Sequence, residues 1–118
     1  MKDRDISILI KIVQYSDEIS GTISRFELDL DKFKKDYVVR NAISMSVLQI
    51  GELAGKLTED FRLTYNKMPW RDIRALRNIA AHAYGSIDFE ILWGVATVNV
   101  PELKKYCEKI VKENKTII

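Results

Sequence analysis

Hydrophobic residues recur along most of the chain at steps of three and four, a spacing that places them on one face of an α-helix. The first such segment covers about residues 5–20, with repeated positions at Leu9, Ile12, Val13, Ser16 and Ile19. Asp3 or Asp5 can cap its start. We expect Gly21 and the β-branched residues that follow it to interrupt this helix.

The longest regular pattern covers about residues 31–61 and predicts a central helix. Its hydrophobic seam is suited to packing between antiparallel helices and consists of Ile43, Val47, Ile50, Ala54, Leu57 and Phe61. Gly51 and Gly55 lie one turn apart within it. Each glycine costs a helix about 1 kcal/mol relative to alanine. We therefore expect the two glycines to permit the close approach of a neighbouring helix or, alternatively, to face a ligand.

Two prolines divide the rest of the chain into shorter helices. Pro69 suits the first turn of a third helix over about residues 69–81, because its missing N–H is tolerated there. Residues 84–86 read as a turn, and Ser86 or Asp88 can cap a fourth helix. The stripe of that helix contains Ile87, Ile91, Val95 and Val98. Pro101 removes one backbone hydrogen bond, so a kink or a short fifth helix with Leu103, Tyr106 and Ile110 should follow.

These segments predict one all-α domain over residues 1–118, a four- to five-helix up-down bundle with its last helix kinked at Pro101. The length of 118 residues suits a single core, and 5 Gly and 2 Pro are too few for the many turns of an all-β protein. Charge-free runs are shorter than the roughly 18 residues that a membrane span requires. The charged N-terminus lacks an apolar signal core, so we expect a cytoplasmic protein without membrane contact.

Charge and cysteine content narrow the possible chemistry only slightly. The net charge of +2 permits an RNA partner without requiring one. One cysteine and one histidine cannot build a Cys/His zinc site, and Cys107 is expected to be inert. Trp70 and Trp93 are expected to anchor the core or an interface.

The third predicted helix carries a charged residue where a core residue is expected. At about 100° per residue, Arg77 lies about 20° from Trp70, 40° from Ile73 and 60° from Ala80 around the helix, so its side chain should leave from the apolar face and be buried. A buried arginine needs an anionic partner. That partner is either a structural carboxylate such as Glu52 or, in a functional site, a phosphate, which suits the planar guanidinium.

The neighbouring flank of the same helix is polar and basic, with Arg71, Arg74, Asn78 and, if the helix reaches it, His82. Asn78 and His82 are four residues apart, so the amide could orient the imidazole. That arrangement is common for histidines that act as general acids or bases. A histidine near a helix end can equally be a cap or a solvated residue.

The segment RNIAAHAY, residues 77–84, resembles the motif of the HEPN superfamily, and specifically of HepT-like toxins, in which Arg, a polar residue, three spacers, His, any residue and Tyr follow one another. Residues 50–54 are similar to an Ile-Gly-Glu-Ala segment on the long helix of that family. Residues 68–70 resemble its entry to the motif helix, and residues 87–93 resemble the helix that follows. The resemblance extends over about residues 4–103.

The resemblance implies a metal-independent ribonuclease without a cofactor, acting as the toxin of a toxin-antitoxin pair. Its RNA-cleaving residues would be Arg77 and His82, with Asn78 at the polar position. From its place on the same basic flank, we expect Arg74 to support them. The implied partner is a nucleotidyltransferase antitoxin similar to MntA, which would adenylylate Tyr84 and so silence the toxin. A non-catalytic HEPN subunit that binds or docks its nucleotidyltransferase is the alternative, and a purely structural bundle is a third.

RNA cleavage without a metal needs a base, an acid and cations that stabilise the phosphorane. One histidine can fill either the acid or the base role, but not both at once. We therefore expect a homodimer whose His82 and Arg77 residues meet in one composite cleft. An adenylyl group on Tyr84 would place negative charge beside that cleft.

Overall fold

The computed structural model describes residues 3–82 and 89–115, and this part of the chain contains helices and no strand. The helices are α1 (Asp3–Arg25), α2 (Leu30–Lys35), α3 (Tyr37–Ala54), α4 (Glu59–Thr64), α5 (Trp70–His82), α6 (Phe89–Gly94) and α7 (Val100–Lys115), with a π-helical segment, η1 (Val95–Asn99), between the last two. The predicted all-α class is therefore confirmed.

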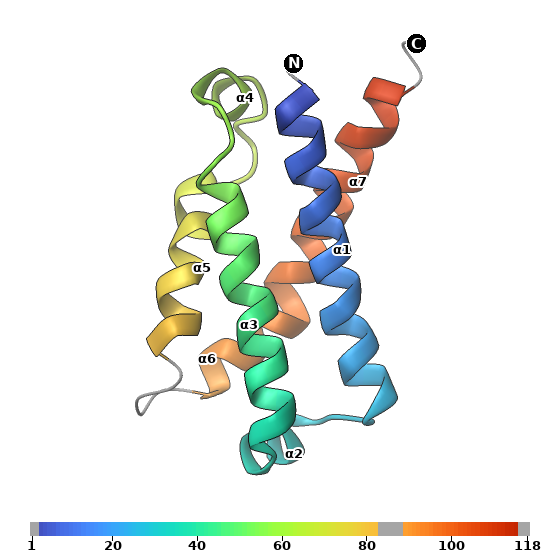
Figure 1. Ribbon diagram of the computed structural model, residues 1–118, viewed down its shortest axis with the longest axis vertical. Helices are drawn as coiled ribbons and strands as arrows, with labels where there is room; N and C mark the ends of the chain where they lie inside the picture. The colour runs from blue at the N-terminus through green and yellow to red at the C-terminus, as the bar shows by residue number, and fades with distance from the viewer. Residues whose placement is uncertain (1–2, 83–88, 116–118) are drawn as a thin grey trace.

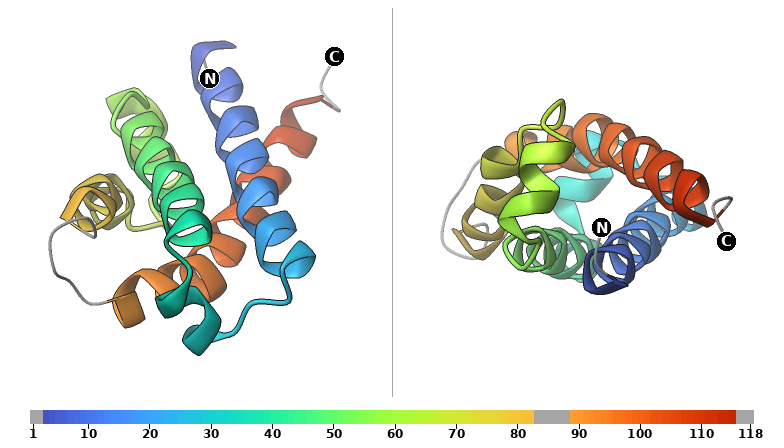
Figure 2. Two further views of the ribbon diagram at one scale, coloured as in Figure 1. Left: turned by 60° about the horizontal axis from the view of Figure 1, so that its bottom comes forward. Right: turned by 90° about the horizontal axis from the view of Figure 1, so that it is seen from above.

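Four long helices, α1, α3, α5 and α7, run along the long axis of the molecule and alternate in direction (Figure 1). Seen from above, they surround one core, with α3 between α1 and α5, and with α7 beside α1 (Figure 2). The short helices α2 and α4 lie at opposite ends of this bundle (Figure 1). None of the described helices is both long and apolar enough to cross a bilayer.

Each long helix contributes buried side chains to the core, as the hydrophobic periodicity predicts. The residues with almost no exposed surface include Leu9, Ile12, Ile19, Ile43, Val47, Ile50, Ala80, Leu103 and Cys107. Burial raises the pKa of the Cys107 thiol to about 12. The thiolate is the reactive form, so this burial agrees with the prediction that Cys107 is inert. Trp70 is buried, and Trp93 packs against Phe33 with 5.1 Å between ring centroids.

The predicted interruption of the first helix at Gly21 is wrong, because α1 continues through it to Arg25. Gly21 has no atom within 4 Å of the position that a Cβ would occupy. Buried Ile19 and partly buried Ile23 on either side of it still pack against the core. Their packing offsets the roughly 1 kcal/mol by which a glycine weakens a helix.

The predicted single helix over residues 31–61 is also wrong, because it is three helices. Asp36 ends α2 and caps α3, where its side chain accepts a hydrogen bond from the Val38 N–H at 2.9 Å. Thr58 caps α4 in the same way. Local hydrogen bonding by Asp and Thr side chains competes with the helical ladder, and the hydrophobic spacing does not reveal it.

Asp5 does not cap α1, contrary to expectation. It lies within the first turns of α1, is buried, and accepts hydrogen bonds from the Thr58 N–H at 2.9 Å and the Thr58 hydroxyl at 2.8 Å. These two bonds attach the start of α4 to α1, although 53 residues separate the partners. Thr58, the N-cap residue of α4, is thus held by a carboxylate of α1.

The fourth predicted helix buries a different face from the one that its hydrophobic spacing predicts. Leu92, Val95 and Ala96 are buried, whereas Ile91 and Val98 of the predicted stripe are exposed. The proposed caps Ser86 and Asp88, together with Ile87, lie outside the described residues.

Between α6 and α7 the helix widens to π geometry, and the Val100 N–H donates to the Val95 carbonyl. This widening directly precedes Pro101, which cannot donate and would crowd a regular turn. Beyond it the predicted short fifth helix is α7, which extends to Lys115.

Candidate functional site

The contacts of Pro69 and Trp70 fix the start of α5. The Pro69 carbonyl accepts hydrogen bonds from the Asp72 and Ile73 N–H groups, both at 3.0 Å. The Trp70 indole donates to the Tyr65 carbonyl at 2.8 Å, and its ring lies 5.5 Å from that of Phe61. A helix anchored at its first residue presents the side chains that follow in a defined orientation.

α3 and α5 approach each other closely at Gly51 and Arg77. A Cβ atom built on Gly51 would lie 2.4 Å from the backbone nitrogen of Arg77 and 2.9 Å from its Cβ. Such distances leave no room for any side chain at position 51. The prediction that Gly51 permits the close approach of a neighbouring helix is therefore confirmed.

Arg77 is not buried, contrary to expectation, since 53% of its side chain is exposed. Its backbone lies against Gly51, but its side chain leaves the helix contact and runs over the surface of α3. There the guanidinium Nε donates to the Glu52 carboxylate, the partner that a structural role would require. Nη1 donates to the Asn78 side-chain oxygen at 3.3 Å.

The Arg77–Glu52 ion pair contributes little to folding stability. Glu52 is 40% exposed, and ion pairs in such surroundings are typically worth about 0–1 kcal/mol. Arg77 is therefore not held in place by the high cost of burying an unpaired charge. Its exposure leaves the guanidinium accessible to a ligand.

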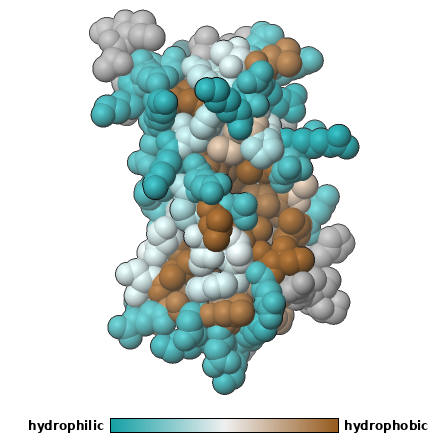
Figure 3. Space-filling model, turned by 180° about the vertical axis from the view of Figure 1, so that it is seen from behind, coloured by the Kyte–Doolittle hydropathy of each residue, from teal (hydrophilic) through white to brown (hydrophobic). Residues whose placement is uncertain are grey.

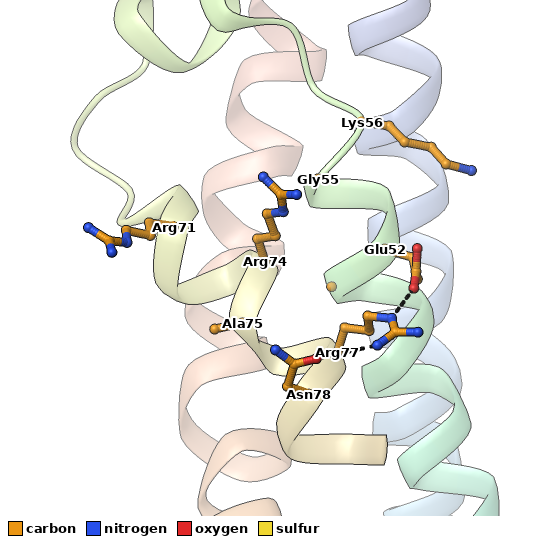
Figure 4. Close-up of a pocket in the computed structure, with 9 residues that line it drawn as sticks. Glu52, Gly55, Lys56, Arg71, Arg74, Ala75, Arg77 and Asn78 are labelled. Carbon is orange, nitrogen blue, oxygen red and sulfur yellow. Dashed lines mark hydrogen bonds and ion pairs between the residues drawn. The ribbon is translucent and has the colours of Figure 1, made fainter. Parts of the chain in front are cut away.

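A cavity of about 570 Å³ lies between the end of α3 and the outer face of α5, in front of Arg77 (Figure 4). It is lined by Gly51, Glu52, Gly55, Lys56, Arg71, Arg74, Ala75, Arg77 and Asn78. Four of these described lining residues are cationic, and Glu52 is the one carboxylate among them. Cations gathered in a concave surface attract a polyanion.

Several predicted site residues meet in this cavity. Arg74, Arg77 and Asn78 line it together with Arg71, as their helical spacing indicates. Gly55 also lines it, and a Cβ there would lie 3.4 Å from the Nε of Arg74. Lys56 was not among the predicted site residues, and its position directly after Gly55 is the signal in the sequence that points to it.

The remaining predicted site residues fall at the edge of the described structure. His82 is the last residue of α5, so the motif helix does reach it. The placement of its side chain, and with it the predicted contact to Asn78, lies outside the described residues. Tyr84 also lies outside them.

One known protein family matches most of this chain. A family model described as Ribonuclease HepT-like matches residues 12–110. The chain belongs to the HepT-like family. The matched range contains both the Gly51–Glu52 segment of α3 and the whole of the RNIAAHAY segment.

Curated relatives cover most of the chain. The protein named "Putative RNase MJ0125" from Methanocaldococcus jannaschii is 30% identical over 114 residues, covering 96% of this chain and 97% of its own length. "Putative RNase TTE0752" from Caldanaerobacter subterraneus is 31% identical over 88 residues, which is 75% of this chain and 79% of that protein. "Probable ribonuclease HepT" from Thermococcus cleftensis is 29% identical over 86 residues, with 73% and 78% covered. No solved structure matches significantly.

The contact between Gly51 and Arg77 can be tested by adding one methyl group. Gly51→Ala should lower the free energy of unfolding by about 1–3 kcal/mol, because the methyl group overpacks the α3–α5 contact. Gly21→Ala is the matched control: its surroundings are open, so it should stabilise the protein by about 0.5–1 kcal/mol. Urea denaturation measures both. Equal stabilities for the two variants would contradict the close contact.

Proposed function

We propose that this HepT-like chain is a metal-independent endoribonuclease in which Arg77 and His82 act on the RNA, supported by Asn78 and Arg74. The observation that carries the proposal is the exposed Arg77 guanidinium within a cavity lined by four cations. RNA presents one phosphate per nucleotide, and phosphate contacts from Arg and Lys dominate the affinity of proteins for nucleic acids. The relatives named as RNases support the same activity.

The residues of the cavity fit a reaction in which cations, rather than a metal ion, stabilise the phosphate. A base removes the proton of the 2′-OH, whose oxygen attacks the adjacent phosphorus; the bond to the 5′ oxygen breaks, and an acid protonates that oxygen. The products are a 2′,3′-cyclic phosphate and a 5′-OH. His82 is the histidine available for proton transfer, and Arg77 would stabilise the charge of the phosphorane. The described lining carboxylate, Glu52, is already engaged by Arg77.

A homodimer would supply both the acid and the base. The chain contains one histidine, so two copies of His82 would be needed for both roles at once. α6 begins seven residues after His82, and its lower end lies near the end of α5 (Figure 1). Ile91 of α6 and Val98 of η1 are 51% and 56% exposed, and hydrophobic surface gathers in the lower half of the rear face (Figure 3). A second copy that covers this face would bring the two His82 residues together.

We propose further that the enzyme is the toxin of a toxin-antitoxin pair, silenced by a nucleotidyltransferase partner that adenylylates Tyr84. Tyr84 follows His82 by two residues, so its phenolic oxygen would carry the added phosphate close to the cationic cavity. The new negative charge would compete there with the phosphates of RNA.

The first experiment is RNA cleavage by the purified protein in EDTA. The wild type should cut single-stranded RNA, whereas Arg77→Ala and His82→Ala should lose activity by a factor of 100 or more, since each removes a group that acts in the transition state. Gel analysis of labelled oligonucleotides measures the rates, and circular dichroism confirms matched folds. Lys105→Ala, an exposed change on α7 outside the cavity, is the control. A wild type that binds its nucleotidyltransferase but leaves a broad RNA panel intact would favour the docking-subunit function.

The dimer is tested by a charge on the proposed interface. Ile91→Glu or Val98→Glu should convert the protein to monomers in sedimentation and lower cleavage at least tenfold, because a buried unpaired carboxylate is costly. Leu63→Glu is the control, since Leu63 is 67% exposed but lies on α4 at the other end of the bundle.

Mixed dimers test the composite site directly. A heterodimer of wild-type and His82→Ala chains should be nearly inactive, because it can provide an acid or a base but not both. Full activity of that heterodimer would refute the composite site.

The modification is tested with the nucleotidyltransferase and ATP. The wild-type chain should gain the mass of one or more adenylyl groups on Tyr84 and lose RNA cleavage, while Tyr84→Phe should gain none there and stay active. Mass spectrometry locates the site. Inhibition of Tyr84→Phe by the same treatment would show that silencing does not require this tyrosine.

A further inference from the structure

Two neighbours hold the guanidinium of Arg77 in one orientation. Nε donates to the Glu52 carboxylate on α3, and Nη1 donates to the Asn78 side chain on α5. A guanidinium has five N–H groups. Among the described residues, these two hydrogen bonds leave one N–H on Nη1 and both on Nη2 without a protein partner.

The edge of the guanidinium that remains open is set by Glu52. Arginine binds a phosphate through two parallel N–H groups, either on its Nε–Nη2 edge or on its Nη1–Nη2 edge. Glu52 engages Nε, so the Nη1–Nη2 edge is the one that this ion pair leaves open, and among the described residues Asn78 alone contacts it, through Nη1. Figure 4 shows Nε of Arg77 turned toward the Glu52 carboxylate and one Nη atom turned toward Asn78.

The close helix contact fixes Glu52 relative to Arg77. Glu52 directly follows Gly51, the residue whose missing side chain lets the Arg77 backbone approach. Arg77 is therefore part of this close contact, and Glu52 is the residue next to it on α3. Although the pair is held at its base, both side chains are partly exposed and can be reached by a substrate.

We propose that Glu52 is a positioning residue for the ribonuclease reaction, which holds Nε of Arg77 and so directs the Nη1–Nη2 edge to the scissile phosphate. The inference rests on the proposed ribonuclease function. Glu52 also weakens the binding of RNA, because its negative charge repels an RNA phosphate in the same cavity. Its removal should therefore tighten RNA binding and slow cleavage.

Glu52→Gln tests this pair of effects, because glutamine keeps the shape and removes the charge. We expect kcat to fall about tenfold, since a misplaced catalytic group can reduce the rate strongly, and KM to fall severalfold. A structural ion pair alone would change stability and leave kcat unaltered. Glu52→Asp, which retains the carboxylate, should recover part of kcat and a KM near that of the wild type.

Asp72→Asn is the matched control. Asp72 is an exposed carboxylate in the first turn of α5 and does not line the cavity. Its loss should leave kcat unchanged. An equal kcat for Glu52→Gln and the wild type, or an equal fall of kcat for Asp72→Asn, would overturn the positioning role.

Nuclear magnetic resonance of the Arg77 side chain tests the binding edge without any cleavage. A 2′-deoxy oligonucleotide, which lacks the attacking hydroxyl, should shift the Nη signals of wild-type Arg77 and leave its Nε signal in place. In Glu52→Gln the Nε signal should also shift. A shift of the wild-type Nε signal would show that the phosphate displaces Glu52 and would overturn the inference. This titration remains decisive if the wild type cuts no RNA, in which case the proposed ribonuclease function itself fails.

Discussion

The approach of α5 to α3 at Gly51 is the contact on which the site depends. Two helices can meet backbone to backbone only where one of them lacks a side chain, and a Cβ on Gly51 would lie 2.4 Å from the Arg77 nitrogen. The contact places Arg77 against α3, next to Glu52. It also brings the cationic flank of α5 beside the end of α3, so that the cavity forms between them. The helix weakness that a glycine introduces is thus offset by the packing it allows.

The charges that line the cavity add little to folding stability. Arg71, Arg74 and Arg77 share its wall with Lys56, and Glu52 is the lining carboxylate in the described structure. Exposed ion pairs contribute little to folding, and like charges in one hollow repel one another. A polyanion relieves that repulsion, which is why a concave cationic surface suits the phosphates of RNA.

The hydrophobic spacing anticipated the bundle but not where its helices end. The seam from Ile43 to Ala54 is buried as expected, because burial on one face follows directly from a period of 3.6 residues. The predicted helix over residues 31–61 includes Asp36 and Thr58, where the chain in fact leaves one helix and begins another. Those boundaries depend on hydrogen bonds of individual side chains, including the bond from Thr58 to distant Asp5.

The sequence by itself determined the all-α class, the family motif and the set of cationic residues on α5, because each is a matter of local spacing along one helix. Only the tertiary structure decided that Arg77 is exposed and not buried. Its angular position on the helix indicates the core. The path of its side chain depends instead on α3, where Gly51 lets the Arg77 backbone approach and Glu52 holds the guanidinium. Lys56 joins the site for the same reason, because the lining residues of α5 that it meets in the cavity are 15 or more residues away in the chain. Contacts between helices are set by packing, which no single helical period encodes.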